Sequence, residues 1–145
     1  MLTAGEAAPD FELPDQNNDI KTMEDFIEDK LVMFFYIKDN TPGWTKEAVS
    51  FRDNIKVLDS LGAKVVGVSK DSVKSHKKFA EKYDLNFPLL ADSDGELCRA
   101  FGTLNMLGIV KRSTFIIENR EIIKAFNQVK VSGHVEEVIE FLKQL

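Results

Sequence analysis

The sequence predicts an α/β fold, and three stretches near the middle of the chain carry that prediction. Residues 31–37 (LVMFFYI) form an unbroken apolar run between polar residues, which is typical of a strand buried on both faces. Residues 64–69 (KVVGVS) have the same character and predict a second buried strand. Between the two runs, apolar side chains recur at the spacing of one helical face: Trp44, Ala48, Phe51, Ile55 and Leu58. A strand, a helix and a strand in this order make a βαβ unit, whose two strands are parallel.

Length and composition are those of one globular domain, so residues 1–145 are expected to fold as a single unit. Hydrophobic residues make up 43% of the chain and charged residues 30%, which is too apolar for a disordered protein. The net charge of −5 argues against a broad basic surface for nucleic acid or anionic lipid. No apolar run approaches the roughly 20 residues of a membrane span, and no secretory signal is recognisable. A cytoplasmic protein is therefore expected.

The segments before the βαβ unit are short. Residues 1–10 show no regular pattern and are expected to be an irregular lead-in. Residues 11–13 alternate as in a strand that Pro14 ends, and residues 20–22 fit the returning strand of a hairpin. Residues 23–27 then offer about one helical turn.

Helices and strands continue to alternate after the first strand of the βαβ unit. The central helix follows a loop at 41–43 and is expected to end at Gly62, and Asp71 is the expected N-cap of a second helix that extends to Tyr83. The later segments, in chain order, are a strand at 87–91, a turn at 92–95, a short helix at 96–101, strands at 112–117 and 122–126 joined by a turn at 118–120, and a helix after Ser132-Gly133 whose apolar face is Val135, Val138, Ile139 and Leu142. The late strand pair completes the α/β pattern.

Standard catalytic and cofactor motifs are absent from the sequence. It contains no GxxxxGK[ST], GxGxxG or HExxH string, so no nucleotide, cofactor or metal is expected. His76 and His134 are far apart in the sequence and lack metal-ligand spacing, and each is expected to be exposed or to cap a helix. The acidic residues are scattered, and their spacing singles out no acid–base pair.

The order of several short segments carries the functional information. Residues 35–53 (FYIKDNTPGWTKEAVSFRD) resemble the active-site segment of the peroxiredoxins, and the match is closest to the peroxiredoxin Q group, also called bacterioferritin comigratory proteins. Similar segments follow the family's order along nearly the whole chain: APDF at 8–11, GVS at 67–69, DSVKSH at 71–76, FPLL at 87–90, DG at 94–95, RSTF at 112–115 and GHV at 133–135. The resemblance implies a thioredoxin fold of the peroxiredoxin type, with a central mixed sheet flanked by helices and an N-terminal extension.

Peroxiredoxins reduce peroxides with a cysteine thiolate in the first turn of the long helix, where the helix N-terminus and a nearby arginine lower the thiol pKa. The resemblance assigns this peroxidatic position to Trp44, and the usual resolving position, five residues on, to Val49. Thr41 and Arg112 match the family's peroxide-binding threonine and its arginine, whereas Ile37 stands where the motif has a proline. Both cysteine positions therefore lack sulfur, and the sequence leaves open whether the loss is natural or engineered.

An indole has no accessible anionic form and cannot form the sulfenic acid of the family reaction, so we expect no thiol peroxidase activity. Two function classes stay open: a degenerate peroxidase, or a non-catalytic binding or dimerisation module that partners a redox enzyme or forms one domain of a longer protein. The expected partner is a thioredoxin-like reductant or a redox enzyme, with no role for nucleic acid or membrane. The chain is expected to be a monomer or a homodimer.

Trp44 has two interpretations. It begins the helical apolar stripe, so it is expected to be buried near Thr41 as a plug of the peroxide pocket. Arg112 would then lie against the indole face and gain a cation–π attraction of roughly 0.5–2 kcal/mol. The alternative is that the indole is a stacking platform for a ligand.

Cys98, the only cysteine, also has two interpretations. It lies near the start of a predicted helix beside Arg99, and in that setting it would replace the lost nucleophile. Its position near Leu97 and Phe101 on an apolar helix favours a buried small hydrophobe instead.

Overall fold

The computed structural model describes residues 1–127, 130 and 132–145. Its centre is a five-stranded sheet with the order β5-β4-β3-β6-β7. The strands are β3 (Lys30–Phe35), β4 (Ala63–Ser69), β5 (Leu89–Ala91), β6 (Ser113–Glu118) and β7 (Glu121–Asn127). Strands β3, β4 and β5 are parallel, and β6 and β7 run antiparallel to their neighbours. The predicted βαβ unit and the mixed sheet are confirmed.

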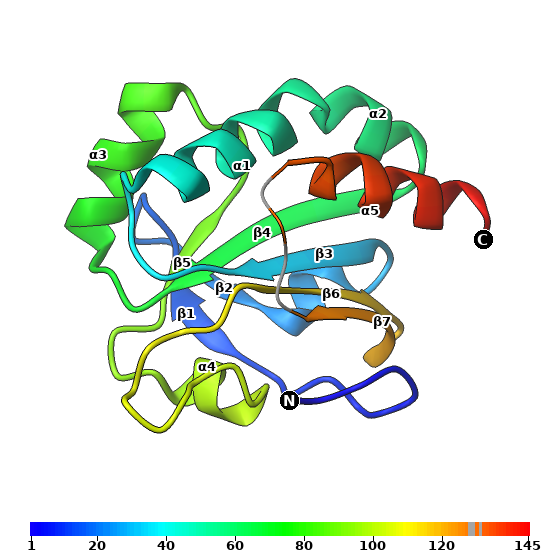
Figure 1. Ribbon diagram of the computed structural model, residues 1–145, viewed down its shortest axis with the longest axis horizontal. Coiled ribbons are helices and arrows are strands. Elements are labelled where there is room, and N and C mark those ends of the chain that lie inside the picture. Colours follow the sequence, from blue (N-terminus) through cyan, green and yellow to red (C-terminus); the bar gives the residue numbers. More distant parts are fainter. Residues whose placement is uncertain (128–129, 131) are drawn as a thin grey trace.

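Helices cover both faces of this sheet (Figure 1). On one face lie α1 (Pro42–Asp53), α2 (Ile55–Ser60), α3 (Val73–Tyr83) and α5 (His134–Lys143). On the other lie α4 (Glu96–Ala100) and the segment around the hairpin of β1 (Glu12–Pro14) and β2 (Ile20–Thr22), which leads into a short 3₁₀ helix, η1 (Met23–Phe26). Among the described residues, no helix combines the length and the apolar character needed to cross a membrane.

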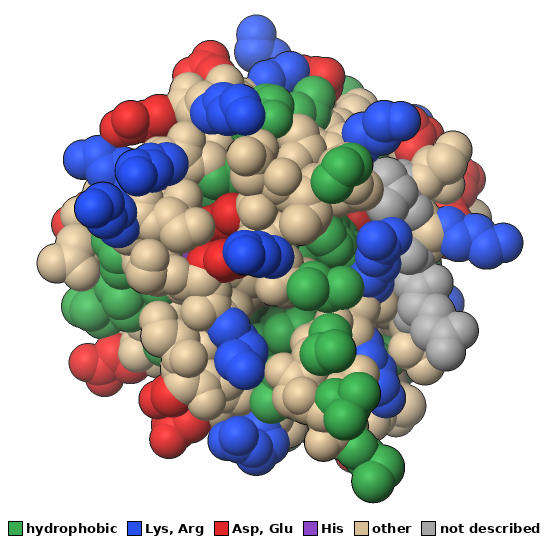
Figure 2. Space-filling model, turned by 60° about the vertical axis from the view of Figure 1, so that its left-hand side comes forward, with side chains coloured by type: hydrophobic (Ala, Val, Ile, Leu, Met, Phe, Trp, Pro, Cys, Tyr) green, Lys and Arg blue, Asp and Glu red, His purple; other side chains and the backbone are tan. Residues whose placement is uncertain are grey.

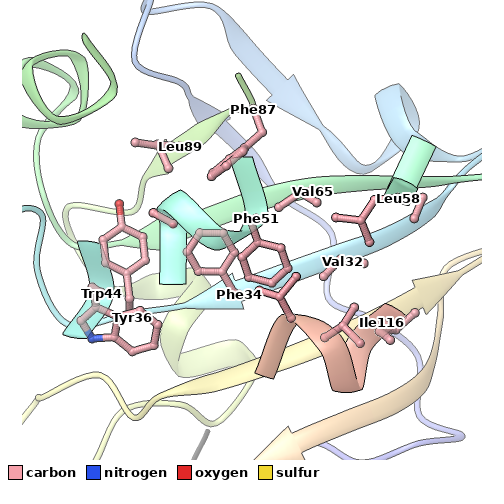
Figure 3. Close-up of a cluster of buried hydrophobic side chains, with 14 of the residues drawn as sticks. Val32, Phe34, Tyr36, Trp44, Phe51, Leu58, Val65, Phe87, Leu89 and Ile116 are labelled. Atoms are coloured by element: carbon pink, nitrogen blue, oxygen red, sulfur yellow. The ribbon is translucent and has the colours of Figure 1, made fainter. Parts of the chain in front are cut away.

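The structure of β3 explains why residues 31–37 of the sequence are apolar without interruption. Side chains alternate along a strand, so successive residues enter two different cores. Val32, Phe34 and Tyr36 belong to the core under α1, α2, α3 and α5, where the ring of Phe34 stacks on that of Phe51 at 5.0 Å (Figure 3). Leu31, Met33 and Phe35 belong to the core on the opposite face. A strand covered on both sides needs apolar side chains at every position.

The prediction of one long helix after Gly43 is wrong in one respect, because the segment forms two helices, α1 and α2. Asn54 separates α1 from α2 with φ −106° and ψ 11°, and its side-chain amide donates to the Ser50 carbonyl at 2.8 Å. An asparagine that bonds to the preceding turn competes with continuation of the helix. The apolar stripe crosses the break, because Leu58 of α2 is buried in the same core as α1.

Two other predicted boundaries are wrong. The N-cap of α3 is Ser72 rather than Asp71, because the Ser72 hydroxyl accepts from the Ser75 backbone N–H at 3.1 Å. Pro14 does not stop the first strand but is its last residue, paired with Ile20. A proline is tolerated at the end of a short two-stranded ribbon, where one missing N–H costs little.

The outer strands of the sheet are in contact with the N-terminal part of the chain. The Gln16 amide donates to one backbone carbonyl just before β5 at 3.0 Å and accepts from the N–H of its first residue at 2.8 Å. The backbone N–H groups of Gly5 and Ala8 donate to the carbonyls of Ile122 and Arg120, at the start of β7. The N-terminal extension implied by the resemblance therefore lies along the sheet.

Candidate functional site

Trp44 lies in the first turn of α1, after the N-cap residue Thr41 and the first helical residue Pro42. Its side chain is only 2% exposed, so the expected burial is observed. Trp44 and Tyr36 are at one end of the core, with ring centroids 5.7 Å apart (Figure 3). The indole nitrogen is on the side away from Phe34 and Phe51, and no described residue forms a hydrogen bond with it. The residue thus extends the core to the start of the helix.

Arg112, the residue before β6, lies over the ring of Trp44. Its guanidinium carbon is 5.1 Å from the centroid of the Trp44 ring, which is within cation–π range. Among the described residues, no ion pair joins Arg112 to a carboxylate. The two positions that the resemblance matches to the family's nucleophile and arginine are therefore in contact.

The other matched residues are less closely associated. The Thr41 hydroxyl donates to the Lys38 carbonyl at 2.9 Å, so the side chain is bonded within the loop before α1. Val49 is half-buried in α1, and five residues place it about 140° around the helix from Trp44. Ile37 is 44% exposed at the end of the β3 segment. The geometry joins Trp44 and Arg112, with Thr41 at the helix start, and leaves Val49 on a different side of α1.

Glu47, one turn after Trp44, is a polar residue that sequence reasoning missed. It is fully buried, and neither of its carboxyl oxygens has a hydrogen-bond partner in the described part of the chain. Burial raises the pKa of Glu47 from 4.5 to about 8, although the positive charge of Arg112 opposes the shift. The sequence does contain a signal for it. Glu47 is three residues after Trp44 and four before Phe51, so it falls within the apolar stripe of the helix.

His134 faces Glu47 from the first turn of α5, and the expectation that it is exposed or capping is wrong. It is 2% exposed, and the N-cap of α5 is Gly133. The His134 Nε2 atom is 2.8 Å from the Thr114 hydroxyl and 3.8 Å from Glu47 Oε1. Burial lowers the pKa of His134 from 6.5 to about 4. The imidazole is buried because α5 packs it against two aromatic rings, those of Phe51 and Phe126.

His76 is also buried, contrary to the expectation for it. Its Nδ1 atom is 2.8 Å from Asp39 Oδ2, and its Nε2 atom is 3.0 Å from the Leu90 carbonyl. A carbonyl and a carboxylate only accept hydrogen bonds, so this network assigns a proton to each ring nitrogen and a positive charge to His76. Tyr36 donates its hydroxyl to Asp39 Oδ1 at 2.6 Å. Burial, together with the charge of Asp39, raises the pKa of Tyr36 well above its ordinary value, which keeps the phenol a donor.

Among the described residues, Asp39, Asp71 and His76 form the cluster that most resembles a metal site, since their ligand atoms lie within 4.8 Å of one another. Those atoms already have partners. Asp71 Oδ2 accepts from the Asp39 backbone N–H at 2.9 Å and from the Ser69 hydroxyl at 2.6 Å. Ser75 donates to Asp39 as well. We therefore assign the cluster to anchoring the loop before α1 onto β4 and α3.

Cys98 lies in α4, on the sheet face opposite α1. It is fully buried, and its backbone N–H donates to Asp92 Oδ2 at 2.8 Å. Burial, with the hydrogen bond and negative charge of Asp92, raises the pKa of Cys98 far above its ordinary value. Reactive cysteines are accessible and have lowered pKa values. The environment is that of a small buried hydrophobe.

Comparison with known proteins gives consistent matches over nearly the whole chain. The AhpC/TSA family profile matches residues 4–126. The chain is 39% identical to peroxiredoxin Bcp of Bacillus subtilis, over 99% of this chain and 97% of that protein. The crystal structure of peroxidoxin BcpB from Mycobacterium tuberculosis superposes with a TM-score of 0.94 at 34% identity, covering 100% of this chain and 99% of that one. The bacterioferritin comigratory protein of Xanthomonas campestris, studied for alkyl peroxide reduction, gives a TM-score of 0.88 at 38% identity, covering 92% and 90%.

These matches agree with the mixed five-stranded sheet and the helices on its two faces. The structural neighbours are thioredoxin-fold peroxiredoxins, so the fold implied by the sequence resemblance is confirmed. The chain belongs to the AhpC/TSA family, in its peroxiredoxin Q/Bcp group.

Proposed function

We propose that this chain is a peroxiredoxin whose peroxidase site is closed by Trp44, so that it does not reduce peroxides by the thiolate mechanism. One observation carries the proposal. The residue at the peroxidatic position is an indole, 2% exposed and stacked under Arg112 at 5.1 Å. Alkyl peroxide reduction, studied in the Xanthomonas campestris relative, is then a lost ancestral activity of this chain.

The chemistry of the missing step supports this function. In the family reaction a thiolate attacks one peroxide oxygen, the O–O bond breaks, and the sulfur becomes a sulfenic acid that a second thiol reduces. Trp44 and Val49 supply no sulfur, and the only thiol, Cys98, is buried on the other face of the sheet. Arg112, which would lower a thiol pKa, is instead engaged by the indole face.

A peroxide-consumption assay tests the proposal. The purified chain is mixed with hydrogen peroxide or an alkyl hydroperoxide, with dithiothreitol or thioredoxin as reductant. We expect the background rate, and the same rate for Cys98→Ser. Turnover that depends on the reductant and disappears in Cys98→Ser would show that catalysis has moved to Cys98, and the proposal would fail.

A second candidate is a non-catalytic binding or dimerisation module, and one surface feature favours it. The turn at 105–109 exposes Met106 fully and Leu107 by 83%, while the Asn105 side chain accepts from two backbone N–H groups of the turn. These hydrogen bonds fix the backbone of the turn, which projects both hydrophobic side chains into solvent. Hydrophobic, basic and acidic side chains are interspersed on the face drawn in Figure 2.

Sedimentation velocity distinguishes this candidate. A homodimer held by the 105–109 turn would dissociate in the double variant Met106→Ser, Leu107→Ser, whereas a monomeric wild-type chain would count against dimerisation. We propose that the redox partner is a thioredoxin-like protein or a redox enzyme, and that the protein is located in the cytoplasm. Calorimetric titration of thioredoxin into the wild-type chain and into the double variant tests the proposed partner.

A further inference from the structure

Glu47 is the polar residue of the site whose hydrogen-bonding atoms have the fewest partners among the described residues. Its side chain is fully buried, and no described residue donates a hydrogen bond to either carboxyl oxygen. A carboxylate without donors is far more costly to bury than a neutral carboxyl. The proton on Glu47 is therefore a condition for the packing seen around α1. A raised pKa, to about 8, agrees with this geometry.

The titratable groups on elements that share this core with α1 come from several parts of the chain. Arg112, before β6, is the cation that acts on it, and His134 of α5 is 3.8 Å away but has a pKa lowered by burial to about 4. Tyr36, at the end of β3, has its hydroxyl engaged by Asp39. Lys124 of β7 lies over the rings of Phe126 and Phe141. Arg112 is thus the charged group whose position can respond to Glu47.

Trp44 is held by the same arginine. The cation–π contact of Arg112 is the polar interaction of the indole, because the indole N–H has no partner among the described residues. Trp44 and Glu47 are three residues apart on α1, so both side chains lie toward one side of the helix. Arg112 is half-buried, and within the described residues it forms no ion pair with a carboxylate.

We propose that Glu47 and Trp44 compete for Arg112, and that the proton on Glu47 decides which of them holds it. With the proton in place, the guanidinium stays on the indole face and Trp44 closes the site. When the proton leaves to solvent, the carboxylate draws the guanidinium away, and Trp44 loses its cover. This step deepens the proposed function, since it assumes that Trp44 is the plug of the site.

Fluorescence measures the step directly, because Trp44 is the only tryptophan in the chain. The emission maximum and the acrylamide quenching constant are recorded from about pH 6 to about pH 10, a range that brackets ionisation of a carboxyl with a raised pKa. We expect a red shift and a several-fold increase in quenching at the alkaline end. Far-UV circular dichroism over the same range is expected to stay constant, because the opening is local.

Two variants give the controls. Glu47→Gln keeps the shape of the side chain and cannot ionise, so its fluorescence is expected to stay constant over the whole range. Glu137→Gln removes an exposed carboxyl of α5 and is expected to behave as the wild type. The proposal is overturned if the wild-type indole stays shielded throughout, if Glu47→Gln shows the same transition, or if the transition coincides with loss of helix. The peroxide assay above is independent of these outcomes, so failure of one proposal is distinguishable from failure of the other.

Discussion

Trp44 removes the thiol chemistry of the site and also changes the packing at the first turn of α1. Its ring surface adds to the core at the first turn of α1, and its π face takes the guanidinium of Arg112. An arginine in this position needs some partner for its charge, and a cation–π contact is worth about 0.5–2 kcal/mol. The residues that would stabilise a thiolate thus remain in the chain, while the indole engages them.

Trp44→Cys is expected to recover part of the lost chemistry. The new thiol would stand at the N-terminus of α1 with Arg112 released from the indole, and both favour the thiolate. We expect a thiol pKa below the ~8.5 of a free cysteine and a single turnover with hydrogen peroxide. Thiolate absorbance against pH, followed by stopped-flow mixing with peroxide, measures both.

Trp44→Ser is the matched control for that variant and should consume no peroxide. Because Val49 offers no resolving sulfur, repeated turnover of Trp44→Cys should require an added thiol. A pKa at or above ~8.5 without rapid oxidation would mean that Thr41 and Arg112 serve structure alone.

Cys98 is expected to be inert in the folded protein. Its side chain is fully buried and its pKa is raised far above the ordinary value, so the reactive thiolate is scarce and inaccessible. Ellman's reagent should label the native chain very slowly and the chain in urea at once. Met106→Cys, at a fully exposed position, supplies a fast-reacting control. Rapid labelling of native Cys98 would contradict the buried assignment.

The loop between β3 and α1 is the element that positions the site, and α3 holds it. Asp39 of this loop accepts hydrogen bonds from Tyr36, Ser75 and His76, and its backbone N–H donates to Asp71. The start of α1, with Thr41 and Trp44, follows directly. The contacts of Asp39 with Ser75 and His76 therefore tie the start of α1 to α3.

Asp39→Asn tests that anchor. It leaves the His76 imidazolium buried without its counter-charge, so we expect a loss of about 3–5 kcal/mol in the free energy of unfolding. Ser75→Ala removes one hydrogen bond to the same carboxylate and should cost about 1 kcal/mol. Urea denaturation followed by circular dichroism measures both. Equal, small losses would mean that His76 is neutral and that the charge assignment is wrong.

The helices and strands could be predicted from sequence where side-chain periodicity along a short segment determines them. The double-sided burial of β3 and the stripe of α1 follow from side-chain period, and the pairing of Trp44 with Arg112 follows from the family resemblance. Glu47 falls within that stripe, whereas the buried histidines were not predictable in the same way. Their burial depends on α5 and α3 packing from distant parts of the chain, and a polar residue type alone favours exposure. The break in the helix at Asn54 was not predicted, because Leu58 continues the apolar stripe beyond it.

At the scale of the whole molecule, stability should depend on pH through two opposed groups. Between about pH 4.5 and 8 the folded state keeps a proton on Glu47 that the unfolded chain has lost, so stability falls as pH rises. Between about pH 4 and 6.5 the folded state lacks a proton that unfolded His134 carries, so stability rises with pH. The two effects oppose each other below about pH 6.5, and Glu47 acts alone above it.

We therefore predict a decline in the free energy of unfolding between about pH 6.5 and 8, of the order of 1.4 kcal/mol per pH unit. Urea midpoints across this range measure it, at constant ionic strength. Glu47→Gln should remove the decline, and Glu137→Gln should preserve it. A flat wild-type profile would show that Glu47 has a donor in solution.

The contacts that the N-terminal part of the chain makes with the sheet bear on how molecules of this protein meet one another. The outermost strands of an open sheet present free backbone groups, and these can recruit a strand from a neighbouring molecule and begin a fibrillar aggregate. Here Gln16 occupies backbone groups beside β5, and residues 5–8 occupy those at the start of β7. We therefore expect resistance to aggregation at high concentration to involve a single side-chain amide and a short N-terminal stretch of chain.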